Sequence, residues 1–86
     1  MIFKIDGINV YGSGLESEPQ VIPSHISDQS GNASSYLISF KVKRPSILDE
    51  MMQINKRGVV DFEINAQHYT AHFLREDGQN YTFSTH

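Results

Sequence analysis

Apolar and polar residues alternate with a period of two in five stretches of this chain, and one further stretch has a helical period. The alternation runs through residues 2–11, 36–43, 59–64 and 67–73, and it returns at residues 79–84. Such alternation is typical of strands that bury one face. The sequence therefore predicts a protein built mainly of half-buried strands, with a single helix inserted among them.

The segment from Ser46 to Arg57 is the predicted helix. Ser46 is a suitable N-cap because its hydroxyl can accept a hydrogen bond from the amide of Asp49. Gly58 follows the last turn as the expected left-handed C-cap. The apolar residues of this segment are Ile47, Leu48, Met51, Met52 and Ile54. Because they recur at helical spacing, we expect all five to face the core.

The turn residues of two hairpins fix the expected strand pairing. Asp6-Gly7 suits a two-residue type I′ turn, which pairs Ile5 with Ile8. A two-residue turn at Asn65-Ala66 pairs residues 59–64 with the strand that follows. Both pairings put the apolar residues of the two strands on one face, as a half-buried sheet requires.

For the last hairpin we expect a three-residue loop over residues 76–78, with Gly78 at the position that needs a positive φ. This loop pairs Phe73 with Tyr81 and so brings Tyr81 and Phe83 to the apolar face. A two-residue Asp-Gly turn would place both aromatic residues on the opposite face.

Residues 12–34 differ from the rest of the chain because glycine, proline and serine are frequent there. We expect one domain over residues 1–86, with a long irregular loop at 12–34. Long loops in small domains are usually functional or mobile. Two interpretations stay open: a poorly ordered surface loop, or an arm that contacts another subunit, with Val21-Ile22 as a short added strand.

The order of these elements predicts the α+β class with a mainly antiparallel sheet. We expect a small barrel or rolled sheet of five to six strands, with one helix between strands 3 and 4. Barrels that resemble the OB fold also place a helix between their third and fourth strands. Unrelated barrels share this order, so the order alone does not establish function.

Composition narrows the possible chemistry. The 86 residues include no cysteine, so disulfides and thiolate metal sites are excluded. The net charge of −3 argues against general nucleic-acid binding, which needs a phosphate-neutralising surface. No apolar run is long enough to span a membrane, and we identify no signal peptide. We therefore expect a cytoplasmic or virion protein that is not secreted and has no membrane contact.

The polar residues of the predicted strands do not form a catalytic or metal-binding pattern. His68 and His72 are four residues apart, but on a strand this spacing separates them by roughly 13 Å. His68 instead lies opposite Glu63, where an ion pair is expected. Asp61 and Glu63 resemble the outward face of a soluble sheet more than an acid–base pair. We expect no enzymatic activity, no cofactor and no metal ion.

Several residues outside the expected core are candidates for contact with another protein. Ile2 and Tyr11 fall on the mostly polar side of the first hairpin, as part of a covered second face or of an exposed contact surface. Val21, Ile22 and Ile26 are the apolar residues that interrupt the 12–34 loop.

Three basic residues, Lys41, Lys43 and Arg44, cluster where the third predicted strand meets the helix. They form either a solvated face or a binding patch. As a patch they suit an acidic protein partner or a phosphate better than a long nucleic acid.

The opening sequence Met1-Ile2-Phe3-Lys4-Ile5-Asp6-Gly7-Ile8-Asn9-Val10 resembles the starts of small structural proteins from the tails or baseplates of tailed phages. The later order of strand, helix and hairpin is similar to that of tail-tube-like domains. This resemblance implies a structural protein that assembles with copies of itself. It covers about ten residues by sequence, and it assigns no functional residues.

Three functions remain as hypotheses. The first is a structural or protein–protein interaction subunit that self-associates, using an edge strand at residues 1–5 or 79–84 and the 12–34 loop. The second is a small inhibitor or adaptor, of viral or mobile-element origin, that binds a host protein. The third is an OB-like binder of single-stranded nucleic acid or a small ligand, with exposed tyrosines as stacking platforms.

Overall fold

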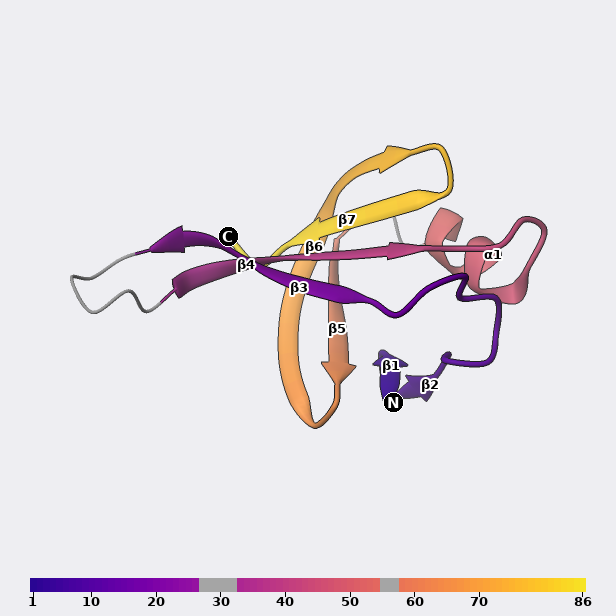
Figure 1. The fold of residues 1–86 in the computed structure, drawn as a ribbon, viewed down its shortest axis with the longest axis horizontal. Coiled ribbons are helices and arrows are strands. Elements are labelled where there is room, and N and C mark those ends of the chain that lie inside the picture. The colour runs from indigo at the N-terminus through magenta and orange to yellow at the C-terminus, as the bar shows by residue number, and fades with distance from the viewer. Residues whose placement is uncertain (27–32, 55–57) are drawn as a thin grey trace.

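The computed structural model describes residues 1–26, 33–54 and 58–86 (Figure 1). Its elements are β1 (Phe3–Ile5), β2 (Ile8–Asn9), β3 (Gln20–Ile26), β4 (Ala33–Lys41), α1 (Ile47–Ile54), β5 (Val59–Ile64), β6 (Gln67–Asp77) and β7 (Asn80–Ser84). The strands form one antiparallel sheet in the order β2-β1-β5-β6-β7-β4-β3. The expected mainly antiparallel α+β class is therefore confirmed.

Three details of the expected architecture are wrong. In the described residues the sheet is open, with β2 and β3 at its two edges, so it is not the closed barrel that was one of the two expected forms. The same residues form seven strands instead of five to six, and the helix follows the fourth strand instead of the third. The last two differences have one cause, because residues 20–26 form the additional strand β3 ahead of the helix.

The described parts of the predicted loop at 12–34, residues 12–26 and 33–34, are also more regular than their composition suggests, and residues 27–32 of this loop lie outside the described residues. Strand β3 pairs with β4 from Gln20 opposite Ser39 onward, and the two form a ribbon that extends away from the other strands (Figure 1). Before β3, the amide of Glu16 donates to the carbonyl of Lys41 at 2.8 Å. The amide of Lys43 donates to the carbonyl of Gly14 at 2.7 Å. Neighbouring backbone, which composition does not reveal, thus orders this segment.

Strand β6 joins the two halves of the sheet. Its first part, Gln67 to His72, pairs with β5, and its last part, His72 to Asp77, pairs with β7. A register shift between Phe73 and Arg75 marks a β-bulge in the second part. Bulges bend a strand and increase its twist. β6 is accordingly long and strongly curved, and the sheet folds around one side of the core (Figure 1).

Both predicted two-residue turns are confirmed. Asp6 and Gly7 have φ values of 51° and 82°, and they pair Ile5 with Ile8. Asn65 and Ala66 have φ values of 50° and 71°, and β5 pairs with β6 in the expected register. Positive φ at both central positions is the mark of the type I′ turn.

The last hairpin differs from the prediction. Asp77 pairs with Asn80, which leaves a two-residue loop at Gly78-Gln79, and Tyr81 lies opposite Glu76 instead of Phe73. The bulge between Phe73 and Arg75 inserts one extra residue, and Phe73 pairs with Phe83 beyond it. The bulge thereby restores the parity that a three-residue loop was expected to provide.

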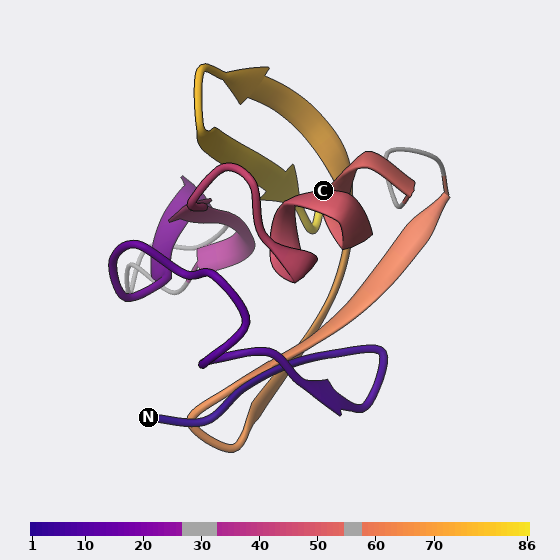
Figure 2. The same cartoon turned by 90° about the vertical axis from the view of Figure 1, so that its right-hand side faces the viewer.

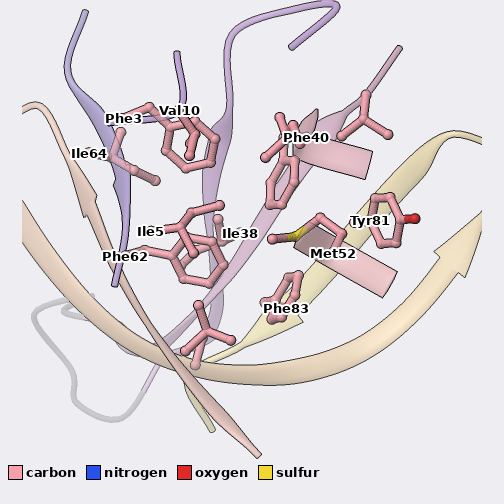
Figure 3. Packing of buried hydrophobic residues seen from close by; sticks show 14 residues of the cluster. Phe3, Ile5, Val10, Ile38, Phe40, Met52, Phe62, Ile64, Tyr81 and Phe83 are labelled. Atoms are coloured by element: carbon pink, nitrogen blue, oxygen red, sulfur yellow. The ribbon is translucent and has the colours of Figure 1, made fainter. Parts of the chain in front are cut away.

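The buried cluster lies between the concave face of the sheet and α1 (Figure 3). Its members are Phe3, Ile5, Val10, Ile38, Phe40, Val42, Leu48, Met52, Val60, Phe62, Ile64, Ala71, Tyr81 and Phe83. Aromatic rings form its centre: Phe62 and Phe83 meet edge to face with centroids 5.0 Å apart. Phe40 contacts Phe3 in the same way at 5.3 Å. Ile8 was expected to share the buried face with Ile5. It is instead 58% exposed at the sheet edge.

Helix α1 closes the open end of the folded sheet (Figure 2). The predicted N-cap is confirmed, because the amide of Asp49 donates to Ser46 Oγ at 3.0 Å. The amide of Leu48 donates to the carbonyl of Ser13 at 3.0 Å. Gly58 has the expected positive φ of 80°, whereas the predicted last turn, with Lys56 and Arg57, lies outside the described residues.

The turn at Ala66 provides a test of the β5–β6 register. Replacing Ala66 by glycine should raise the free energy of unfolding by about 0.5–1 kcal/mol, because glycine adopts a positive φ without the steric cost that alanine bears. Gly7→Ala is the matched control, since Gly7 has φ of 82° and open space where a Cβ would lie. It should lower stability by about 1 kcal/mol. Urea denaturation measures both changes; a loss of stability in Ala66→Gly would contradict the turn.

Gly14 tests the packing of the 13–16 segment against the helix N-terminus. A Cβ at Gly14 would overlap Cβ and Oγ of Ser46, and Gly14 has φ of 124°. Gly14→Ala should therefore destabilise the protein by about 2 kcal/mol or more. Gly12→Ala is the control, because nothing lies within 4 Å of a Cβ at Gly12. Similar melting temperatures for the two variants would show that the segment does not pack as described.

Candidate functional site

A polar network attaches one side of α1 to strand β7. The ring of Tyr81 is buried, and its hydroxyl points out of the apolar cluster (Figure 3). This hydroxyl donates to Asp49 Oδ1 at 2.8 Å and accepts from Gln53 Nε2 at 2.6 Å. Asp49 and Gln53 are four residues apart on α1, so they lie on the same side of the helix. One tyrosine therefore belongs to both the apolar core and the helix attachment.

Arg44 completes the network from the connection between β4 and α1. Its guanidinium Nε donates to Asp49 Oδ1 at 3.0 Å, and its Nη2 contacts both Glu76 and the Tyr81 hydroxyl. These hydrogen bonds, to Tyr81, Asp49 and Glu76, raise the pKa of Arg44 above its ordinary value. The network thus joins the loop before α1, the helix itself and the β6–β7 hairpin.

The same contacts shift the pKa values of Asp49 and Tyr81. Desolvation alone would raise the pKa of Asp49, but hydrogen bonds from Tyr81 and Arg44 outweigh it and lower that pKa. For Tyr81, desolvation and the hydrogen bond to Asp49 raise the pKa of the hydroxyl. Asp49 is therefore held as a carboxylate and Tyr81 as a neutral phenol. This combination favours a structural donor–acceptor pair over proton transfer.

The side of α1 that does not face this network carries an apolar strip, which we define as Ile47, Met51 and Ile54. Ile47 is 65% exposed and Ile54 is 79% exposed, while Met51 is partly buried against the core. The spacing i, i+4, i+7 places the three residues on one face. The expectation that all five apolar residues of the helix face the core is wrong, because only Leu48 and Met52 are buried.

The reason lies in the angular width of the apolar positions. At 100° per residue, the five apolar side chains occupy roughly 160° of the helix circumference. The core contacts the part around Leu48 and Met52 and only partly covers Met51, and the polar network fixes the adjacent side through Asp49 and Gln53. The width of the apolar arc is a sequence signal that could have revealed the strip.

The apolar residues proposed from the sequence as contact candidates lie in three places. Ile2 and Tyr11 are exposed beside the β1–β2 hairpin, which favours the second of their two interpretations. On β3, Ile22 is exposed at the sheet edge, whereas Val21 is partly buried against the core. Ile26 ends β3, and its side chain lies outside the described part of the structure.

The three basic candidates have different surroundings. Arg44 is engaged in the network with Tyr81. Lys41 lies 3.9 Å from Glu16, and both side chains are largely solvent-exposed, so this ion pair contributes little stability. Lys43 is exposed. The structure thus divides the cluster into a network member, a surface ion pair and a solvated lysine.

An open groove of about 500 Å³ lies on the polar face of β1, β5 and β6. Polar side chains on its walls are Lys4, Asp6, Asp61, Glu63, His68 and Thr70. Thr70 Oγ1 donates to Asp61 Oδ1 at 3.1 Å, and His68 Nε2 lies 3.7 Å from Glu63 Oε1, as the expected ion pair. Within the described residues, no three His, Asp or Glu side chains gather to hold a metal ion.

Tyr81→Phe tests the network without removing the buried ring. At pH 7 it should lower the free energy of unfolding by about 1–2 kcal/mol, because the Asp49 carboxylate and Gln53 lose a hydrogen-bond partner. The folded-state pKa of Asp49 is depressed, so its stabilising contribution is present above about pH 4 and is lost as the pH falls through the folded-state value. The effect of the substitution should therefore shrink as the pH falls below about 4.

Urea denaturation at pH 7 and at about pH 3 measures this difference. Tyr11→Phe is the matched control, because Tyr11 is exposed and should change stability by no more than about 0.5 kcal/mol. An equal loss for Tyr81→Phe at both pH values would contradict the assigned role of Asp49.

Comparison with known proteins adds no family assignment. A scan against protein-family models, a search of curated proteins and a search of solved structures each returned no match for the chain. No helix in the described ranges is long and apolar enough to cross a membrane. Functional inference for this chain therefore rests on its own residues and contacts.

Proposed function

We propose that this chain is a non-catalytic protein–protein interaction subunit that self-associates. The observation that supports this proposal is the exposure of large apolar side chains outside a well-packed core. Four of them are more than half exposed: Ile8 at 58%, Ile47 at 65%, Ile54 at 79% and Val59 at 65%. Single exposed apolar residues are ordinary, but two of these four, Ile47 and Ile54, lie on the same face of α1.

The small size of the chain gives a physical reason for self-association. A domain of this length buries only roughly 60–65% of the surface of its unfolded chain, so the isolated subunit is expected to be modestly stable. Association buries additional apolar area and stabilises the folded state by mass action. A net charge of −3 is too small to oppose association between copies.

The resemblance of the first ten residues to tail and baseplate proteins of tailed phages supports a more specific form of the proposal. In that form the subunit is a component of a phage-type assembly. The expectation that residues 1–5 or 79–84 form an edge strand for these contacts is wrong, because β1 lies between β2 and β5 and β7 lies between β6 and β4.

Light scattering coupled to size-exclusion chromatography tests self-association over a concentration series from about 1 to 500 µM. We expect the mass to rise towards a defined oligomer, because association by apolar burial follows mass action. A clean monomer at the highest concentration would contradict self-association. That result would favour the second hypothesis, a monomeric adaptor or inhibitor that binds a host protein.

A further inference from the structure

We propose that Asp77-Gly78 is a site of spontaneous chemical modification, at which Asp77 converts to isoaspartate, whereas Asp6-Gly7 is protected by the fold. These are the two places in the 86 residues where glycine follows aspartate. A glycine amide is easy to approach because glycine carries no Cβ, so an aspartate before glycine is the one that reacts most readily. The proposal concerns the lifetime of the folded subunit and does not depend on self-association.

The reaction needs no partner other than water. The amide nitrogen of Gly78 attacks Cγ of the protonated Asp77 carboxyl group, and the carboxyl hydroxyl leaves as water with the amide proton. The product is a five-membered cyclic imide, which a second water molecule then opens. When the ring opens at the main-chain carbonyl, the chain continues through Cγ of Asp77 and gains one methylene. No bond is oxidised or reduced in either step.

The two glycines are equally accessible, but the two aspartates are held differently. Gly7 and Gly78 have φ values of 82° and 62°, and nothing lies within 4 Å of a Cβ at either. The amide of Asp6 donates to the carbonyl of Asp61 at 2.8 Å, and the amide of Asp61 donates to Asp6 Oδ1 at 3.1 Å. The second bond fixes the carboxyl group that would have to turn towards Gly7. Ring closure at Asp6 must break this bond, which slows it.

Asp77 lies at the exposed end of β6, where the strand has lost one of its neighbours. Within the described strands, β5 pairs with β6 only as far as His72, so the last part of β6 is paired with β7 alone. Asp77 and Asn80 form the final pair before the loop, and the end of a ladder opens more often than its middle. In the described part of the chain, no hydrogen bond or ion pair holds the exposed Asp77 side chain.

The other half of this loop is fixed. The amide of Val42 donates to the carbonyl of Gln79 at 2.9 Å, and Asn80 Nδ2 donates to Ser39 Oγ at 3.0 Å. The freedom to bring a carboxyl group and the next amide together is therefore greatest at Asp77 and Gly78.

The added methylene acts on the network that attaches α1. Glu76, directly before Asp77, contacts Nη2 of Arg44 and accepts from Gln53 Nε2 at 3.3 Å. Lengthening the main chain at Asp77 disrupts its pairing with Asn80 and moves Glu76 relative to the helix. The converted protein should therefore melt about 2–6 °C below the fresh protein.

Incubation of the folded chain at about pH 6 and 37 °C, followed by trypsin digestion, measures the two sites separately. Cleavage after Lys4 and Arg75 places Asp6 and Asp77 in different peptides. An isoaspartate peptide keeps its mass but elutes at a different time in reversed-phase chromatography. We expect Asp77 to convert at least about fivefold faster than Asp6. Equal rates, faster conversion of Asp6, or no conversion at either site over about four weeks would overturn the proposal.

The same chain unfolded in guanidinium chloride is the matched control, because both aspartates then lose their folded surroundings. Their rates should agree within about twofold there. A fivefold difference that persists in the unfolded chain would assign the effect to the flanking residues and overturn protection by the fold.

Asp77→Glu tests the consequence for the helix. Glutamate keeps the charge but would have to close a six-membered ring, which forms far more slowly. The variant should keep its melting temperature through the incubation, while that of the wild type falls as isoaspartate accumulates. An unchanged melting temperature in converted wild-type protein would overturn the proposed link between Asp77 and the attachment of α1.

Discussion

The orientation of α1 depends on Tyr81, whose side chain lies partly in the apolar core and partly in a polar network. The ring of Tyr81 is buried with the aromatic residues of the core, and its hydroxyl bonds to Asp49 and Gln53 on α1. A buried hydroxyl must be paired, since an unpaired one costs free energy. This requirement fixes which side of the helix faces β7. The remaining side then contacts the core through Leu48, Met52 and part of Met51, and Ile47 and Ile54 stay exposed.

Local chemistry was sufficient to predict a large part of the fold. Asp6-Gly7 and Asn65-Ala66 specify their turns because the backbone there needs positive φ, and each turn sets the register of its strands. The cap at Ser46 is equally local. The bulge near Leu74 could not be predicted in this way, nor could the full extent of the strand at residues 20–26, of which only Val21-Ile22 was considered as a short strand. Both depend on partners distant in sequence: β7 for the bulge, and β4 for a strand with weak alternation and a proline.

The candidate site was predicted less well than the fold. Ile47 and Ile54 have the pattern of core residues, and only the contacts of the rest of the helix reveal that the core does not reach them. Arg44 was grouped with Lys41 and Lys43 by charge, although its planar guanidinium suits it to bind carboxylates in a network, unlike the lysines. The sequence thus shows which residues are charged and which are apolar. It does not show which of them contact the core or the network, because that depends on the orientation of the helix.

The sharing of β6 between the two halves of the sheet has a consequence for how the molecule gains and loses structure. Because β5 and β7 pair with successive parts of the same strand, each loses one of its two ladders if β6 detaches, and β5 is then paired only with β1 and β7 only with β4. The halves should therefore open as one cooperative unit, with no stable partly folded form. Strand β1 joins β5 across some sixty residues, so folding must close a long loop before the N-terminal hairpin gains its contacts. That hairpin is expected to be the last part to become ordered.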